Sequence, residues 1–188
     1  MNATRQNLIN AAKQLLAERG YDATSPSQIL ALSGCGKGSF YHHFKGKKEL
    51  CIAAMEDRVD ELIHEFNELF MVERPINERL ERYFLKPRDG LAGCRIGRIV
   101  QDPSIIDPEF HKPLQRYFAH LADHIEKALQ AAIDEQQIEP VDPTATSAAL
   151  LAALQGGFVL ARATQQSDKL QQAIKGVLCL VKPITPQS

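Results

Sequence analysis

Residues 24–50 read TSPSQILALSGCGKGSFYHHFKGKKEL, and this stretch decides the fold of the first part of the chain. A short helix is predicted after Ser25 and Pro26, because serine caps a helix start and proline is tolerated at the first helical position. A second short helix is predicted over 37–44. Gly34 lies between the two and suits a tight turn that requires a positive φ. The stretch therefore predicts two short helices joined by a turn, the helix-turn-helix layout.

The two short helices are expected to pack against each other and against a preceding amphipathic helix that Gly20 ends. Four apolar residues are expected to form this packing: Ile29, Leu32, Phe40 and Phe44. The outward face of the second helix is then polar, and in a helix-turn-helix that helix enters the major groove of DNA. The predicted DNA-binding residues are Thr24, Ser25, Lys37, Gly38, Ser39, Tyr41, His42, Lys47 and Lys48. His43 is expected to pack or cap, although a DNA contact stays open.

Charge is distributed unevenly along the 188 residues, whose formal net charge is −1. Residues 1–50 carry seven Lys and Arg against three Asp and Glu, a net charge of +4, and residues 51–188 carry −5. A basic head on an acidic body favours contact with a polyanion, with chance as the alternative. The absence of a secretory signal or a long apolar run, and four cysteines without a CxxC pair, predict reduced thiols and a cytoplasmic location.

Helical periodicity extends along the whole sequence, and no segment reads convincingly as a strand. The fold class predicted is therefore all-α. The chain is expected to divide into a helix-turn-helix head, 1–50, which binds DNA, and a larger helical body, 51–188. The helices expected after the head lie at about 47–70, 75–85, 94–100, 108–136, 144–164 and 168–182.

The head resembles the TetR family of bacterial transcriptional repressors over about residues 4–52. The family pattern T…I-A-x-x-A-G-V-x-x-G-x-L/F-Y-x-H-F-x-x-K-E-x-L is matched in both spacing and residue type. The matching residues are Thr24, Ile29, Leu30, Ala31, Gly34, Gly38, Phe40, Tyr41, His43, Phe44, Lys47 or Lys48, Glu49 and Leu50. Ser33, Cys35 and Gly36 depart from the pattern, and Gly36 weakens the cap of the second helix by only a few tenths of a kcal/mol.

The resemblance implies an all-α homodimer, in which 1–50 form a three-helix DNA-binding head and 51–188 form a body of roughly six helices that binds a ligand and dimerises. It also implies a repressor that binds a pseudo-palindromic DNA operator and is released by a small-molecule effector held inside the body. Some aromatic and neighbouring residues would then line a pocket, with a purely structural role as the alternative: Tyr83, Phe84, Cys94, Ile99, Tyr117, Phe118, Leu121 and Phe158. The last two helices would form the dimer interface, through Ala148, Leu151, Ala152, Gly156, Ile174, Val177 and Leu178.

The sequence also contains features of other functions. Cys94 beside Arg95 could make the chain an electrophile or oxidant sensor, or could be an inert thiol, while Cys51 and Cys179 are expected in the core. His120 and His124 have the i, i+4 spacing of metal ligands, but no HExxH glutamate lies between them, so surface or pocket-rim histidines are expected. No catalytic constellation, phosphate-binding loop, metal set or cofactor motif is recognised, so an enzyme is not expected. A helical adaptor without ligand response is a further alternative.

Overall fold

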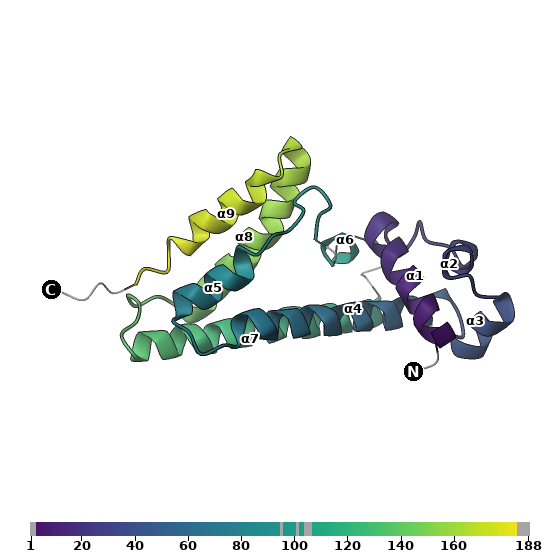
Figure 1. Ribbon diagram of the computed structural model, residues 1–188, viewed down its shortest axis with the longest axis horizontal. Coiled ribbons are helices and arrows are strands. Elements are labelled where there is room, and N and C mark those ends of the chain that lie inside the picture. The colour runs from purple at the N-terminus through teal and green to yellow at the C-terminus, as the bar shows by residue number, and fades with distance from the viewer. Residues whose placement is uncertain (1–2, 95, 101, 104–106, 184–188) are drawn as a thin grey trace. The chain divides into compact units, whose positions relative to one another are not determined.

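The computed structural model describes residues 3–94, 96–100, 102–103 and 107–183, and these residues form an all-helical protein (Figure 1). The only extended pairing among them is an isolated bridge between Ile138 and Pro183. The all-α prediction is confirmed. The helices are α1 Ala3–Arg19, α2 Pro26–Ser33, α3 Lys37–His43, α4 Lys47–Phe70, α5 Ile76–Phe84, α6 Gly97–Val100, α7 Pro108–Asp134, α8 Pro143–Thr164 and α9 Asp168–Leu178.

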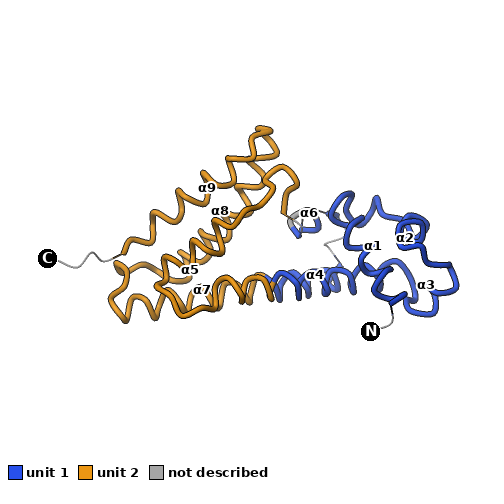
Figure 2. Tube along the Cα trace, in the orientation of Figure 1, with its two compact units in different colours: residues 1–62, 95–117 blue, residues 63–94, 118–188 orange. Residues whose placement is uncertain are grey.

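The chain divides into two compact units (Figure 2). Unit 1 comprises residues 1–62 and 95–117, and unit 2 comprises residues 63–94 and 118–188. Helices α4 and α7 therefore each contribute their first part to unit 1 and their second part to unit 2. Unit 1 contains more than the expected head, because α6 and the start of α7 pack with α1–α4. The division at residue 50 by function stays a prediction.

The core of unit 1 forms where α2 and α3 pack on α1. Ile29, Phe40 and Phe44 are buried there, as their spacing predicts. The prediction for Leu32 is wrong, because 46% of this residue is exposed. An eight-residue helix lying on α1 buries a single face, and Ile29 occupies that face of α2. The core residues that α1 supplies are Leu8, Ile9, Ala11, Ala12, Leu15 and Leu16.

Helix α2 begins and ends as its sequence predicts. The Ser25 hydroxyl accepts a hydrogen bond from the Gln28 amide, and the Gln28 side chain accepts one from the Ser25 amide, which completes a capping box. Gly34 ends α2 with a φ of 66°, a left-handed conformation that glycine adopts without strain. Asp142 caps α8 through the Ala145 amide, at 3.0 Å. These contacts are local, so sequence alone could anticipate them.

The turn after α1 depends on Gly20. Its φ is +81°, and a Cβ placed there would lie 2.5 Å from Oδ2 of Asp102. That same carboxylate oxygen accepts a hydrogen bond from the Tyr21 amide at 2.7 Å. Gly20 therefore provides both the left-handed backbone and the space through which Asp102 reaches the end of α1.

In unit 2, α8 and α9 lie side by side (Figure 1). Gly157 of α8 allows the close approach, because a Cβ there would lie 2.9 Å from Leu170 Cδ1 of α9. Helix α9 ends at Leu178 and not near residue 182 as predicted. Beyond it the chain leaves the helix, and the Lys182 carbonyl accepts a hydrogen bond from the Glu139 amide at 2.9 Å. Cys179 is consequently exposed, so its prediction as a core residue is wrong.

Helix α8 is long and apolar enough, by length and composition, to cross a membrane. A core helix of a folded protein passes the same test, and one face of α8 is used in that way here. Leu150, Leu154, Phe158 and Ala161 of α8 are buried within the chain.

We expect Gly20→Ala to lower the free energy of unfolding by about 1–3 kcal/mol, because alanine is strained at positive φ and its methyl group collides with Asp102. Chemical unfolding followed by circular dichroism measures this loss. The same substitution at Gly38, in α3, has nothing within 4 Å of the added Cβ. It should leave stability unchanged or raise it by up to about 1 kcal/mol. Equal stability of Gly20→Ala and wild type would contradict the role given to this turn.

Cys51 of α4 is fully buried, and burial raises the pKa of its thiol to about 12. Because only the thiolate is nucleophilic, we expect Cys51 to resist alkylation at pH 8 in the folded protein while exposed Cys179 reacts. Mass spectrometry after iodoacetamide treatment, with and without denaturant, measures the difference. An unfolded thiol has a pKa of about 8.5, so the stability that Cys51 contributes should fall as pH rises from there toward 12. Equal labelling of the two residues in the native state would refute this.

Candidate nucleic-acid interface

The exposed face of α3 carries most of the residues predicted to bind DNA. Lys37, Gly38, Tyr41 and His42 are exposed on it, and Ser39 is half-buried. Beneath this face the Phe40 ring is buried and contacts the Tyr41 ring edge-to-face, with centroids 5.0 Å apart. Packing of one aromatic ring therefore orients the next, and 56% of Tyr41 faces outward.

The two predicted residues that precede α2 serve the fold of the turn. Thr24 is buried, and its hydroxyl donates a hydrogen bond to the Gly20 carbonyl at 2.7 Å. Ser25 is half-buried and caps α2. The hydroxyl of Thr24 is thus engaged within the chain, in the turn between α1 and α2.

The lysines at the start of α4 have partners within unit 1. The Lys47 ammonium lies 3.9 Å from the centroid of the Tyr21 ring, a cation–π contact. The Lys48 ammonium pairs with Asp107 at 2.6 Å and with Glu109, both in the segment that begins α7. Sequence reasoning passed over Lys45, which is exposed. Its position just before the two lysines that begin α4 was the available signal.

The surface around α3 offers groups for two kinds of contact with DNA, to phosphates and to base edges. Lys37 and Lys45 are exposed and form no ion pair with the residues that the structure describes, so both ammonium groups are available to phosphate. Tyr41 and His42 add groups that form hydrogen bonds, whereas Gly38 adds no side chain at all. Contacts to phosphate supply affinity and contacts to base edges supply sequence preference. An exposed, polar helix of this composition suits a DNA groove.

The residues predicted to line an effector pocket are divided between the two units. Tyr83, Phe84, Leu121 and Phe158 are buried in unit 2, while Cys94 and Phe118 are half-buried there; Ile99 and Tyr117 are buried in unit 1. Within unit 2 the Phe66 ring contacts the Tyr83 ring edge-to-face with centroids 4.8 Å apart. Phe66, Tyr83 and Phe84 thus form an aromatic cluster in unit 2, and two of its members are predicted pocket residues.

Two histidines of α7 border this cluster. The rings of His120 and His124 lie with centroids 4.1 Å apart, and each also contacts Phe66. His120 Nε2 forms a hydrogen bond with Asn67 Oδ1 at 2.9 Å, and His124 Nδ1 donates to the His120 carbonyl at 2.8 Å. Both side chains are half-buried, so the pair is built into the packing of α4 against α7 in unit 2.

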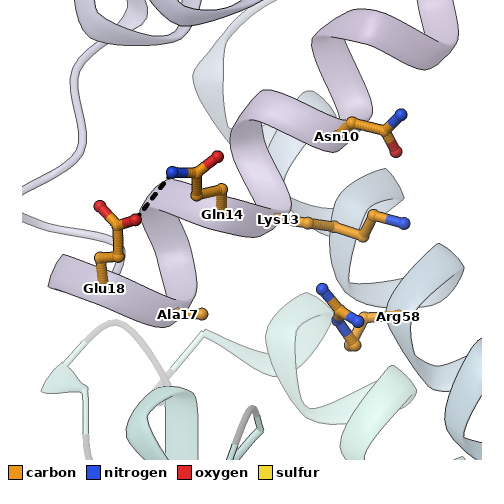
Figure 3. A pocket seen from close by; sticks show the side chains of 6 residues that line it. All are labelled: Asn10, Lys13, Gln14, Ala17, Glu18 and Arg58. Atoms are coloured by element: carbon orange, nitrogen blue, oxygen red, sulfur yellow. Dashed lines mark hydrogen bonds between the residues drawn. The ribbon is translucent and has the colours of Figure 1, made fainter. Parts of the chain in front are cut away.

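A shallow pocket of about 480 Å³ lies elsewhere, between α1 and α4 of unit 1 (Figure 3). It is lined by Asn10, Lys13, Gln14, Ala17, Glu18 and Arg58. Its cations are paired, because Lys13 contacts Asp57 and Glu61, and Arg58 contacts Glu61 at 2.7 Å. Lys13 is itself buried, so this polar group fastens α1 to α4. None of the predicted effector-pocket residues lines this pocket.

The predicted interface residues fall into two groups. Ala148 and Ala152 are exposed on α8, and Leu151, Gly156, Val177 and Leu178 are half-buried. Ile174 is fully buried within the chain, so its side chain packs inside the protomer. Sequence reasoning missed Val159 and Leu160, which are 52% and 50% exposed on α8. Their place on the same helix as the alanines was the available signal.

Family models match both parts of the chain. The model described as bacterial regulatory proteins, tetR family, matches residues 8–54. The model of the C-terminal domain of LmrA/YxaF-like transcriptional regulators matches residues 78–176, more than half of the chain. The first match covers the helix-turn-helix and its exposed α3 face, and the second covers most of unit 2.

Known proteins agree with this assignment. An HTH-type transcriptional regulator in the lacX 3′ region of Lactococcus lactis is 30% identical, over 89% of this chain and 88% of that protein. The HTH-type transcriptional repressor DhaR of a Mycobacterium species is 25% identical, over 96% of this chain and 93% of that protein. The reduced form of NemR of Escherichia coli has the same fold, with a TM-score of 0.86, 20% identity and coverage of 97% and 100%. The chain therefore belongs to the TetR family of bacterial helix-turn-helix transcriptional regulators.

Proposed function

We propose that this regulator is a repressor that binds a pseudo-palindromic operator as a homodimer and is released by a small molecule bound in its C-terminal body. The observation that carries the proposal is the exposed polar face of α3 above the buried Phe40 ring, in a chain whose family regulates transcription. The description of its relative DhaR as a repressor supports the direction of regulation. We place its action in the cytoplasm, where operator DNA lies.

Each residue of the α3 face is assigned a role in reading DNA. Lys37 reaches a guanine edge or a phosphate, and Tyr41 and His42 donate hydrogen bonds to phosphates. Gly38 allows the backbone of α3 to approach the bases, since its position is open to solvent. Ser39 is half-buried and contributes a hydroxyl that can donate or accept.

The outer face of α8 supports the proposed dimer. Ala148 and Ala152 are exposed one helical turn apart, with Val159 two further turns along. Small residues let a second helix approach closely, and the apolar side chains gain stability when they are removed from water. A two-fold dimer would present two copies of α3 to two half-sites, which is why the operator is expected to be pseudo-palindromic.

The aromatic cluster of unit 2 supports an effector site in the body. Tyr83 and Phe84 offer apolar contact there, and His120 and His124 offer polar groups beside it. A ligand shifts the protein toward release only by the difference in its affinity for the two conformations, so it must bind the DNA-free conformation better. Sensing through Cys94 is not favoured, because neither the family models nor the relatives' descriptions point to cysteine chemistry.

DNA binding is tested with a labelled duplex from the region upstream of the protein's own gene. We expect specific binding that weakens steeply between 50 and 200 mM salt, by about a thousandfold if six or more phosphates are contacted. Lys37→Ala and Tyr41→Ala should each weaken binding roughly tenfold or more, because each removes a contact made by an exposed side chain. Fluorescence anisotropy measures both effects.

The matched control is Lys127→Ala, which removes an exposed cation of α7 in unit 2. Its affinity for DNA should equal that of wild type. If Lys37→Ala and Tyr41→Ala also bind like wild type, the residues assigned to DNA recognition are wrong.

The dimer is tested by placing a charge on α8. We expect Ala148→Glu to fold normally, because the residue is exposed, but to dissociate to a monomer and to bind the operator more weakly. Light scattering coupled to size-exclusion chromatography measures the mass. Ala131→Glu, at an exposed position of α7, serves as the control and should stay dimeric. An undisturbed dimer in both variants would show that α8 does not form the interface.

A further inference from the structure

A clamp of two carboxylates holds one lysine at the start of α4. The Lys48 ammonium lies 2.6 Å from Oδ2 of Asp107 and also contacts Glu109. The other oxygen of Asp107 accepts a hydrogen bond from the Glu109 amide at 3.0 Å and so caps α7. Asp107 is therefore fixed by the helix that it begins, and both carboxylates belong to unit 1.

Further contacts of unit 1 keep this clamp beside the helix-turn-helix. The Tyr21 ring contacts Phe110 of α7 edge-to-face, with centroids 4.7 Å apart. The Tyr21 amide donates to Asp102, which lies in the segment before α7. The start of α7 is thus fastened to the end of α1 independently of Lys48. The hydrogen bonds from Lys48 also hold the pKa of Asp107 below its usual value, so both groups are charged near neutral pH.

We propose that Asp107 and Glu109 withhold Lys48 from DNA in the free protein, and that its release into contact with a phosphate strengthens operator binding. Lys48 lies in the first turn of α4, which follows α3 by a short loop, and it is one of the residues that the sequence predicts to bind DNA. Two carboxylates around one ammonium leave an excess of negative charge there, which repels phosphate at short range. The inference rests on the proposed DNA-binding function and adds an electrostatic restraint to it.

The test is the double variant Asp107→Asn, Glu109→Gln. Asparagine caps a helix as well as aspartate does, so α7 should keep its start, and circular dichroism checks the fold. We expect the variant to bind DNA about 5–10-fold more tightly at 50 mM salt and to add about 0.9 to the salt slope, the value for one further phosphate. Anisotropy with the upstream duplex and with a random-sequence 30-bp duplex measures both quantities.

Lys48→Ala completes a double-mutant cycle. It should weaken the DNA affinity of wild type less than that of the double variant, because in wild type the two carboxylates compete with phosphate for Lys48, and it should abolish the gain of the double variant. The control Asp123→Asn, Glu135→Gln removes two exposed carboxylates of unit 2 and leaves the slope unchanged. It separates a local effect from one of net charge.

Three results would overturn the inference: an unchanged affinity and slope in the double variant, weaker binding by that variant, or an equal loss from Lys48→Ala in both backgrounds. The failure of the proposed function looks different. In that case wild type shows no preference for the upstream duplex, and Lys37→Ala has no effect on it. The random-sequence duplex still tests the clamp in that case, because release of Lys48 strengthens contact with any phosphate backbone. If the protein binds neither duplex, both proposals are refuted.

Discussion

Burial of the Phe40 and Phe44 rings beneath α3 is the interaction on which the face proposed to bind DNA depends. Helix α3 has seven residues, and its N-cap, Gly36, offers no side chain to satisfy the first amides. An isolated helix shorter than about 12 residues is marginal in water, so α3 persists because its apolar side is packed against the rest of unit 1. That packing leaves the opposite side polar and exposed, and it determines which residues can meet a groove.

Several of the positive charges in the first fifty residues are engaged in contacts within the protein. Lys13 is buried against Asp57 and Glu61, Lys47 lies on the Tyr21 ring, and Lys48 is held by two carboxylates. A net charge of +4 therefore overstates what the helix-turn-helix offers to DNA. The carboxylates that hold Lys48 come from the start of α7, so the electrostatics of the face proposed to bind DNA depend on a segment outside the helix-turn-helix.

Helix α8 has one face buried within the chain and another exposed on the surface. Leu150, Leu154 and Phe158 are buried within the chain, while Ala148 and Ala152 are exposed. Helix α8 is therefore apolar along its length although only one face of it is buried within the chain. Close packing on α9 requires Gly157, where any side chain would meet Leu170. The outer alanines are consistent with a second close contact, with another copy of the chain, in the assembly proposed for this family member.

The sequence by itself determined most of the helices, the caps of α2 and α8, the Gly34 turn and the outward face of α3, because each depends on residues within a few positions of one another. The resemblance of residues 24–50 to a known pattern also identified the family. Tertiary structure alone decided that Leu32 is exposed, that Thr24 and Ile174 are buried, and that Lys48 is clamped by Asp107 and Glu109. Those outcomes depend on contacts between segments far apart in the chain, whose meeting is set by packing and which no local pattern encodes.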